Sequence, residues 1–297
     1  MIRTVMIGAA VLGVLASAAP AAGQGTQAAD SVKPHTASAN VTVIDTAFAM
    51  PQLNRTRRIW IYLPPGYAST NRRYPVLYMH DGQNVFDAAT SYAGEWGVDE
   101  ALDSLAAAGD PGVIVVAVDN GPERMAEYSP WTHPRAGGGQ GDAYVDFLAN
   151  TLKPWIDARY RTRPGPESTG IMGSSMGGLI SLAAAFRRPD VFGQIGVFSP
   201  SLWFSDSVFV AARESRPAGY RPRFYFVSGG SEGPPEDARV VVTGQEMMVR
   251  ALDEAGWTPA TDVTSVAPDD GKHSEWFWRR EFPAAYQWLF GAANAGR

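Results

Sequence analysis

The sequence predicts an α/β fold in which a mainly parallel sheet is flanked by helices. Residues 112–118 form an uninterrupted apolar run, which is typical of a central strand that is buried on both faces. From about residue 75 onward, short apolar segments alternate with helical ones, whereas the first two strands, at residues 41–46 and 57–63, have no helix between them. We therefore expect one domain over residues 41–297.

The later elements follow from the hydrophobic period and from glycine and proline punctuation. Strands are expected at residues 75–80, 169–172, 192–198, 223–228 and 261–266. Helices are expected at residues 97–108, 142–160, 176–188, 238–255 and 275–290. Ligands in parallel sheets bind at the carboxyl ends of the strands, which is where Asp81, Ser175 and Ser199 fall. The connection between residues 198 and 223 is short, so no large lid is expected.

The first residues have the pattern of a secretory signal peptide. Arg3 is followed by an uncharged apolar run and then by the small residues of Ala19-Pro20-Ala21-Ala22, which suit signal peptidase. The run is shorter than the roughly 20 residues that span a bilayer, so no stable membrane anchor is expected after cleavage. We predict a signal peptide at residues 1–22, a disordered tether at residues 23–40, and a periplasmic or secreted protein.

Composition excludes several classes of protein and site. The chain has no cysteine, which excludes disulfides, a cysteine nucleophile and thiolate metal sites. Its net charge is −5 and it has no basic block, so nucleic acid is not an expected partner. Hydrophobic residues make up 45% and charged residues 19% of the 297 residues, which are ordinary values for a globular protein.

A strand, a tight turn and a helix follow one another around the segment Gly173-Ser-Ser-Met-Gly-Gly178. In this context the G-x-S-x-G pattern predicts a nucleophile elbow, with Ser175 exposed above the sheet. Ser174 does not fit the pattern, because Met172 would then stand at its first glycine position. Glycine at positions 173 and 177 is expected to prevent collisions with neighbouring backbone. The alternative interpretation is a Gly/Ser-rich turn without chemistry.

A nucleophile elbow requires a histidine later in the chain. The four histidines are His35, His80, His133 and His273, and only the last follows Ser175. We therefore predict His273 as the general base. The alternative is a surface histidine next to the last helix.

An acid is expected between Ser175 and His273, where it would hold the imidazole in the productive tautomer. The loop after the strand at residues 223–228 offers Glu232, Glu236 and Asp237. We predict Glu232, which comes first after the glycine turn, and keep Asp237 and Glu236 as alternatives.

The oxyanion hole and the substrate pocket complete the predicted site. The backbone amide of Met176 is one expected oxyanion donor, and that of Gly82 or Gln83 is the second. Of the tryptophans in loops and at helix starts, we expect Trp131 and Trp203 to supply an aromatic wall for an acyl or sugar group. No metal or organic cofactor is implied.

Several motifs together carry a family resemblance that covers residues 56–291. They are the segment at residues 76–87, Asp119-Asn-Gly, Glu127-Tyr-Ser-Pro130, Gly173-Ser-Ser-Met-Gly-Gly178, Phe198-Ser-Pro-Ser-Leu-Trp203 and His273. The chain resembles the putative esterase family of α/β-hydrolases, which includes esterase D-like, feruloyl, acetylxylan and enterochelin esterases. The resemblance implies an α/β-hydrolase fold and a serine carboxylic ester hydrolase with Ser175 and His273 in catalytic roles. It leaves the acid open, because some related siderophore esterases work with a Ser-His pair.

The sequence thus predicts a serine esterase that acts on short-chain acyl esters or on acetyl- or feruloyl-sugar esters. Its expected partner is a small-molecule or carbohydrate ester. Three alternatives remain open. They are a siderophore trilactone esterase, an acyltransferase with the same acyl-enzyme, and a binding module without catalysis on the same fold.

Overall fold

The structure, a computed structural model, describes residues 33–216 and 220–291. Its centre is an eight-stranded sheet with the order β1-β2-β4-β3-β7-β8-β9-β10. The pairs β1–β2 and β2–β4 are antiparallel, and all other neighbours are parallel. The strands are β1 Val41–Met50, β2 Arg55–Tyr62, β3 Val76–His80, β4 Ile114–Val118, β7 Thr169–Ser174, β8 Gln194–Phe198, β9 Arg223–Val227 and β10 Val263–Val266. The predicted, mainly parallel sheet is confirmed.

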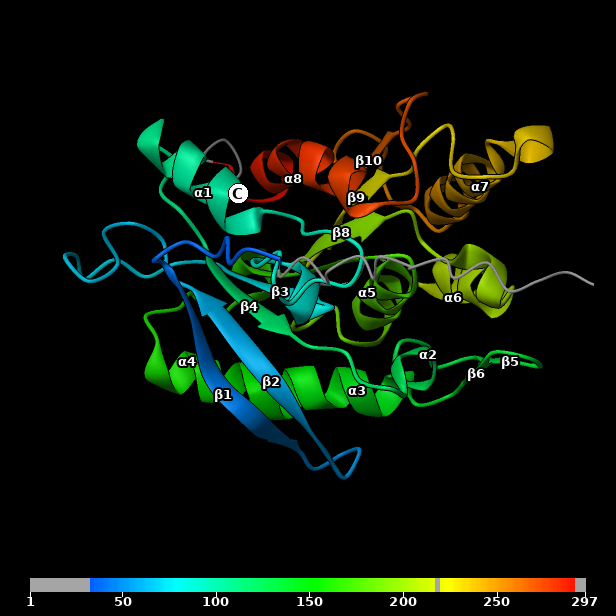
Figure 1. Cartoon of the computed structure of the whole chain (residues 1–297). Helices are drawn as coiled ribbons and strands as arrows, with labels where there is room; N and C mark the ends of the chain where they lie inside the picture. Colours follow the sequence, from blue (N-terminus) through cyan, green and yellow to red (C-terminus); the bar gives the residue numbers. More distant parts are fainter. Residues whose placement is uncertain (1–32, 217–219, 292–297) are drawn as a thin grey trace, which may run out of the picture. The chain divides into compact units, whose positions relative to one another are not determined.

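Helices cover both faces of this sheet (Figure 1). Helices α1 and α8 contact each other and lie on one face, and α3, α4 and α5 lie on the other. The helices are α1 Val98–Ala107, α2 Arg124–Glu127, α3 Gly141–Phe147, α4 Lys153–Arg159, α5 Met176–Arg187, α6 Ser207–Glu214, α7 Val240–Glu254 and α8 Glu275–Phe290. A small separate hairpin pairs β5 Thr132–His133 with β6 Gly137–Gly138. The expected fold class is therefore correct, and no large lid is present among the described residues.

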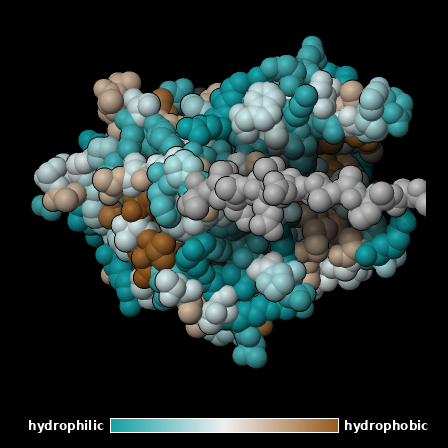
Figure 2. All heavy atoms as spheres, viewed as in Figure 1, coloured by the Kyte–Doolittle hydropathy of each residue, from teal (hydrophilic) through white to brown (hydrophobic). Residues whose placement is uncertain are grey.

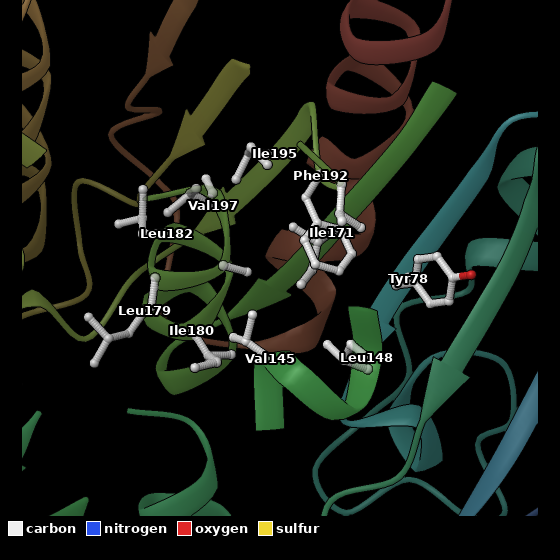
Figure 3. Packing of buried hydrophobic residues seen from close by; sticks show 14 of the residues in the cluster. Tyr78, Val145, Leu148, Ile171, Leu179, Ile180, Leu182, Phe192, Ile195 and Val197 are labelled. Atoms are coloured by element: carbon white, nitrogen blue, oxygen red, sulfur yellow. The ribbon is translucent and has the colours of Figure 1, made fainter. Parts of the chain in front are cut away.

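The alternation of side chains along the strands creates two hydrophobic cores. Tyr78 and Val116 point into one core, and their neighbours Leu77 and Val115 point into the other. Figure 3 shows the first core, where side chains of β3, β7 and β8 pack against α3 and α5. Both faces of the central strands are buried, which explains why those strands are continuous apolar runs in the sequence.

One predicted helix is not uniform. The helix expected at residues 142–160 consists of α3, a π-helical segment at Leu148–Leu152 and α4. The wider turn lies directly before Pro154, which has no amide hydrogen to donate to the carbonyl four residues back. The sequence analysis did not anticipate α2, α6 or the β5–β6 hairpin.

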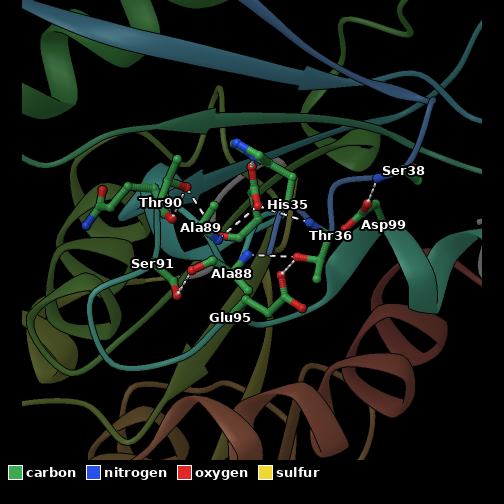
Figure 4. Close-up of polar contacts among 11 residues, drawn as sticks. His35, Thr36, Ser38, Ala88, Ala89, Thr90, Ser91, Glu95 and Asp99 are labelled. Carbon is green, nitrogen blue, oxygen red and sulfur yellow. Dashed lines mark hydrogen bonds and ion pairs between the residues drawn. The ribbon is translucent and has the colours of Figure 1, made fainter. Parts of the chain in front are cut away.

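The predicted tether is wrong for residues 33–40, which lie against the domain (Figure 4). His35 Nδ1 and the amide of Thr36 bind the buried carboxylate of Asp87 at 2.7 and 3.1 Å, and the amide of Ser38 donates to Asp99 at 2.6 Å. The polar composition of these residues suggested exposure to solvent. In the structure their polar groups form hydrogen bonds with buried carboxylates that are distant in the sequence. The predicted signal peptide and residues 23–32 of the predicted tether lie outside the described residues.

Among the described residues, no helix is both long and apolar enough to cross a bilayer. On the face shown in Figure 2 the surface is mostly hydrophilic, with small and separate hydrophobic areas.

Candidate active site

Ser175 occupies the sharp turn between β7 and α5. Its φ of 58° and ψ of −119° lie in a region that residues with a side chain rarely adopt. Its amide donates to the carbonyl of Phe198 at 2.9 Å, which ties the turn to the end of β8. Ser175 is half-buried, and its Oγ lies 3.1 Å from Oγ of Ser201. This is the geometry of a nucleophile elbow.

The glycines of the elbow do not contribute equally. A Cβ at Gly173 would lie 2.8 Å from the ring of His80 and 3.0 Å from the backbone of Gly177, so only glycine fits there. A Cβ at Gly177 would lie 3.4 Å from its nearest neighbour, which is close to ordinary contact. The predicted steric requirement therefore holds at position 173 and is weak at position 177.

His273 and Glu232 form a hydrogen-bonded pair beside this turn. His273 Nδ1 lies 2.8 Å from Oε2 of Glu232, whose side chain is fully buried. The ring of His273 also packs edge-on against Trp278, with centroids 5.2 Å apart. A carboxylate that accepts from Nδ1–H leaves Nε2 of the imidazole able to accept a proton.

Besides His273, two residues hold Glu232, and a third supports one of them. Its Oε1 accepts from the hydroxyl of Ser199 at 2.6 Å and from the amide of Gly229, and Trp278 Nε1 donates to the Ser199 hydroxyl at 2.9 Å. These contacts fix the orientation of the carboxylate before any substrate binds. The alternative acids Glu236 and Asp237 are exposed in a short 3₁₀ turn at Pro235–Asp237 and do not contact His273.

Ser175 and His273 line the same cavity, which has a volume of about 740 Å³. Gln83 also lines it, and its side-chain Oε1 accepts from the amide of Asn120 at 3.2 Å. Gly82 lies behind Gln83, where a Cβ would approach the β4 backbone to 2.8 Å. Met176 opens α5 directly after Ser175, and Gly82 and Gln83 lie in the 3₁₀ turn Gly82–Asn84 after β3. Of these three predicted oxyanion donors, only Gln83 lines the cavity.

Two ion pairs form part of the cavity wall. Arg124 binds both carboxylate oxygens of Asp81 at 2.6 and 2.8 Å, and Asn120 donates to the same carboxylate at 2.6 Å. Burial alone would raise the pKa of Asp81, but the guanidinium of Arg124 and these hydrogen bonds bring it below its ordinary value. Asp119 accepts from Arg58 and from the indole of Trp60 at 2.8 Å each.

The other histidines are engaged elsewhere. His80 is buried beneath the elbow, with Nδ1 3.0 Å from the hydroxyl of Tyr144. Burial lowers the pKa of His80 to about 3, so its ring stays neutral at ordinary pH. His35 binds Asp87, and His133 packs against Trp203 and Phe204. Among the described residues, no three His, Asp or Glu side chains are grouped as metal ligands would be.

A family comparison decides what kind of protein carries this site. The family model described as "Putative esterase" matches residues 50–289. The chain belongs to the putative esterase family. It is therefore a carboxylic ester hydrolase.

Individual proteins resemble this esterase over most of its length. Uncharacterized protein YbbA of Bacillus subtilis (strain 168) is 28% identical over 246 residues, which are 79% of this chain and 93% of that protein. Two solved structures share the fold. A ferulic acid esterase has a TM-score of 0.63 at 19% identity and covers 84% of this chain and 98% of its own. Siderophore hydrolase EstA from Aspergillus nidulans has a TM-score of 0.66 at 18% identity, with coverages of 87% and 95%.

In the structure of the esterase, the two tryptophans that were predicted to form an aromatic wall do not line the cavity. Trp131 lines a separate hollow of about 460 Å³ beside α5 and α6, and Trp203 is 65% exposed against His133. Neither tryptophan lines the cavity that holds Ser175, whereas Tyr92 and Trp278 do. The sequence places Trp131 and Trp203 in loops near the site, but it does not determine the direction in which each indole ring points.

The sequence analysis also missed the ion pairs of the cavity wall. Asp81 was expected at the site, but its pairing with Arg124 and Asn120 was not. A signal was present, because Asp119 and Asn120 directly follow the central strand and so lie at its carboxyl end.

Proposed function

We propose that the protein is a serine esterase that works through an acyl-enzyme, with Ser175 as nucleophile, His273 as base and Glu232 as the orienting acid. The observation that carries this proposal is the hydrogen bond from His273, which lines the same cavity as Ser175, to the buried carboxylate of Glu232, which Ser199 and Gly229 also hold. A merely structural histidine needs neither a fixed tautomer nor a place in the same cavity as an elbow serine.

The reaction follows from these contacts. His273 Nδ1–H donates to Glu232, so Nε2 accepts the proton of Ser175 as Oγ attacks the ester carbonyl. The amide of Met176, with that of Gln83 or Gly82, stabilises the oxyanion. The protonated imidazole then gives its proton to the leaving alcohol, and water, activated in the same way, releases the acid and regenerates Ser175.

The cavity favours a short acyl group on a polar, hydroxyl-rich alcohol, as in acetylated or feruloylated sugars. The exposed Tyr92 offers a ring face, the buried Trp278 adds apolar lining, and the amides and ion pairs of the wall offer hydrogen-bonding groups for hydroxyls. A similar fold occurs in a ferulic acid esterase and in a siderophore hydrolase. We place the anionic trilactone second, because Arg58 and Arg124 are both already paired with carboxylates.

A substrate panel is expected to show this order. Short p-nitrophenyl esters, a feruloyl ester and acetylated xylan should be hydrolysed faster than a catecholate trilactone or long-chain esters, because the described residues form no large lid that a lipid interface would open. The measurement is kcat/KM for each ester at equal ionic strength. Fastest turnover of the longest chain above its micellar concentration would contradict the open-cavity argument, and a preference for the trilactone would make it the substrate. Transfer of the acyl group to an added sugar in place of water would identify an acyltransferase.

We also propose that the protein is exported. Arg3, the apolar run at residues 5–19 and the small residues at 19–22 support a signal peptide. Protein from its native host should begin near Ala22 or Gly23 and should fractionate outside the cytoplasm, as N-terminal sequencing would show. Cytoplasmic protein that retains Met1 would refute export.

A further inference from the structure

The charges on the wall of the catalytic cavity do not balance. Arg124 is paired with Asp81, and Arg58 is paired with Asp119. Glu275 lines the same cavity, and within the described residues its carboxylate forms no hydrogen bond or ion pair with another residue. The wall therefore carries one negative charge that no partner neutralises.

Glu275 places this charge close to His273, the proposed base. It opens α8, two residues after His273, and the whole residue is only 9% exposed. The charged and titratable groups that act on its carboxyl group include His273, Asp81 and Arg124, and the loop that packs against it carries Glu95, which is paired with Arg279. On its other side lies Gly94, where a Cβ would be 3.3 Å from that of Glu275. A wider residue at 94 would displace Glu275, so the loop and the helix fix its place together.

We infer that Glu275 determines the charge specificity of the esterase, since its unpaired carboxylate makes the cavity reject anionic esters and favour esters with a neutral, hydroxyl-rich or cationic group. This inference rests on the proposed function and adds a selectivity to it. The negative charge of an anionic ester is repelled by this carboxylate in the confined cavity. The repulsion lowers kcat/KM for that ester. Hydroxyl and ammonium groups instead donate hydrogen bonds to the carboxylate.

A structural role for Glu275 makes a different prediction. A carboxylate in the first turn of a helix stabilises the helix through its dipole, and Glu275→Gln would lower the melting temperature on that ground alone. Loss of helix stability changes the amount of active enzyme for every substrate alike. The ratio of kcat/KM between an anionic and a neutral ester is independent of that amount, so it separates the two roles.

The pH dependence supplies a second readout. Burial raises the pKa of Glu275 above its ordinary value, and nearby His273 opposes the rise only in part. Glu275 is then uncharged at low pH and becomes negative as the pH rises through its pKa. The anionic-to-neutral ratio of the wild type should therefore fall with rising pH, and it should stay flat in Glu275→Gln.

The experiment uses two pairs of esters of similar size that differ in charge. On the acyl side these are mono-4-nitrophenyl adipate and 4-nitrophenyl hexanoate, and on the alcohol side 4-acetoxybenzenesulfonate and 4-acetoxybenzenesulfonamide. The pH series uses only the second pair, because its charges are constant over the range, whereas the adipate carboxyl titrates in the same range as a Glu side chain. The full-length esterase, Glu275→Gln and Glu246→Gln are compared at low ionic strength. Glu246 is exposed on α7 and does not line the cavity, so its substitution changes the net charge equally.

We expect Glu275→Gln to raise the anionic-to-neutral ratio about tenfold in at least one pair, with Glu246→Gln unchanged. The 6-aminohexanoate analogue should move in the opposite direction. Unchanged ratios in both pairs, or equal changes in the two variants, would overturn the inference while the esterase activity stands. Failure of the wild type to hydrolyse any of the four esters would overturn the proposed function, and this inference with it.

Discussion

Ser175→Ala is expected to fold normally and to lose on the order of 10⁴-fold or more of its activity on a short p-nitrophenyl ester, because nucleophile, base and acid act as a unit. The strained turn is held by backbone bonds, among them that of the Ser175 amide to Phe198, which alanine keeps. Apart from the reacting oxygen, the substitution removes only the contact with the hydroxyl of Ser201. Activity and the melting temperature are measured on the same preparation.

Ser174→Ala is the matched control for this variant. Ser174 ends β7, is buried and also lines the cavity, but the positive φ of the elbow belongs to Ser175 and not to Ser174. This variant should keep most of the activity and should still react with a fluorophosphonate. Substantial turnover in Ser175→Ala, with the fluorophosphonate label on another residue, would disprove the assignment of the nucleophile.

The parts of the site that the sequence predicted are those encoded in contiguous residues. The elbow requires only a strand, a glycine turn and a helix in succession, and the structure has these between Thr169 and Arg187. Glu232 was selected because it directly follows a strand and a glycine turn, and in the structure it bonds to His273 while Glu236 and Asp237 stay in solvent. The carboxyl ends of parallel strands meet at one edge, so such local rules also predict proximity.

The parts that the sequence did not predict depend on partners that are distant in the chain. Asp81 and Arg124 are brought together by the sheet edge, and Thr36 reaches Asp87 and Glu95 across the domain surface. Neither contact has a periodic or local signature. The direction of a large side chain is a packing outcome of the same kind, which is why Trp278 rather than Trp131 or Trp203 lines the cavity.

Glu232→Gln should lower kcat by on the order of 10³–10⁴-fold while leaving the fold intact. Two donors, the hydroxyl of Ser199 and the amide of Gly229, point at one side-chain oxygen of residue 232. The glutamine must place its carbonyl oxygen there, which turns its NH₂ group toward Nδ1 of His273. The imidazole then accepts at Nδ1 and carries its proton on Nε2, so it cannot take the proton of Ser175.

The same network explains why the exposed acids are suitable controls for that variant. Glu236→Gln and Asp237→Asn should keep activity near that of the wild type, because neither side chain contacts His273. The tautomer argument also predicts that the loss falls on kcat far more than on KM, since Glu232 is fully buried behind the imidazole and does not line the cavity. Loss of activity in Asp237→Asn, together with normal activity in Glu232→Gln, would identify Asp237 as the acid. Full activity in all three variants would mean that Ser175 and His273 work as a pair, with the carboxylate serving only to hold Ser199 and the glycine turn.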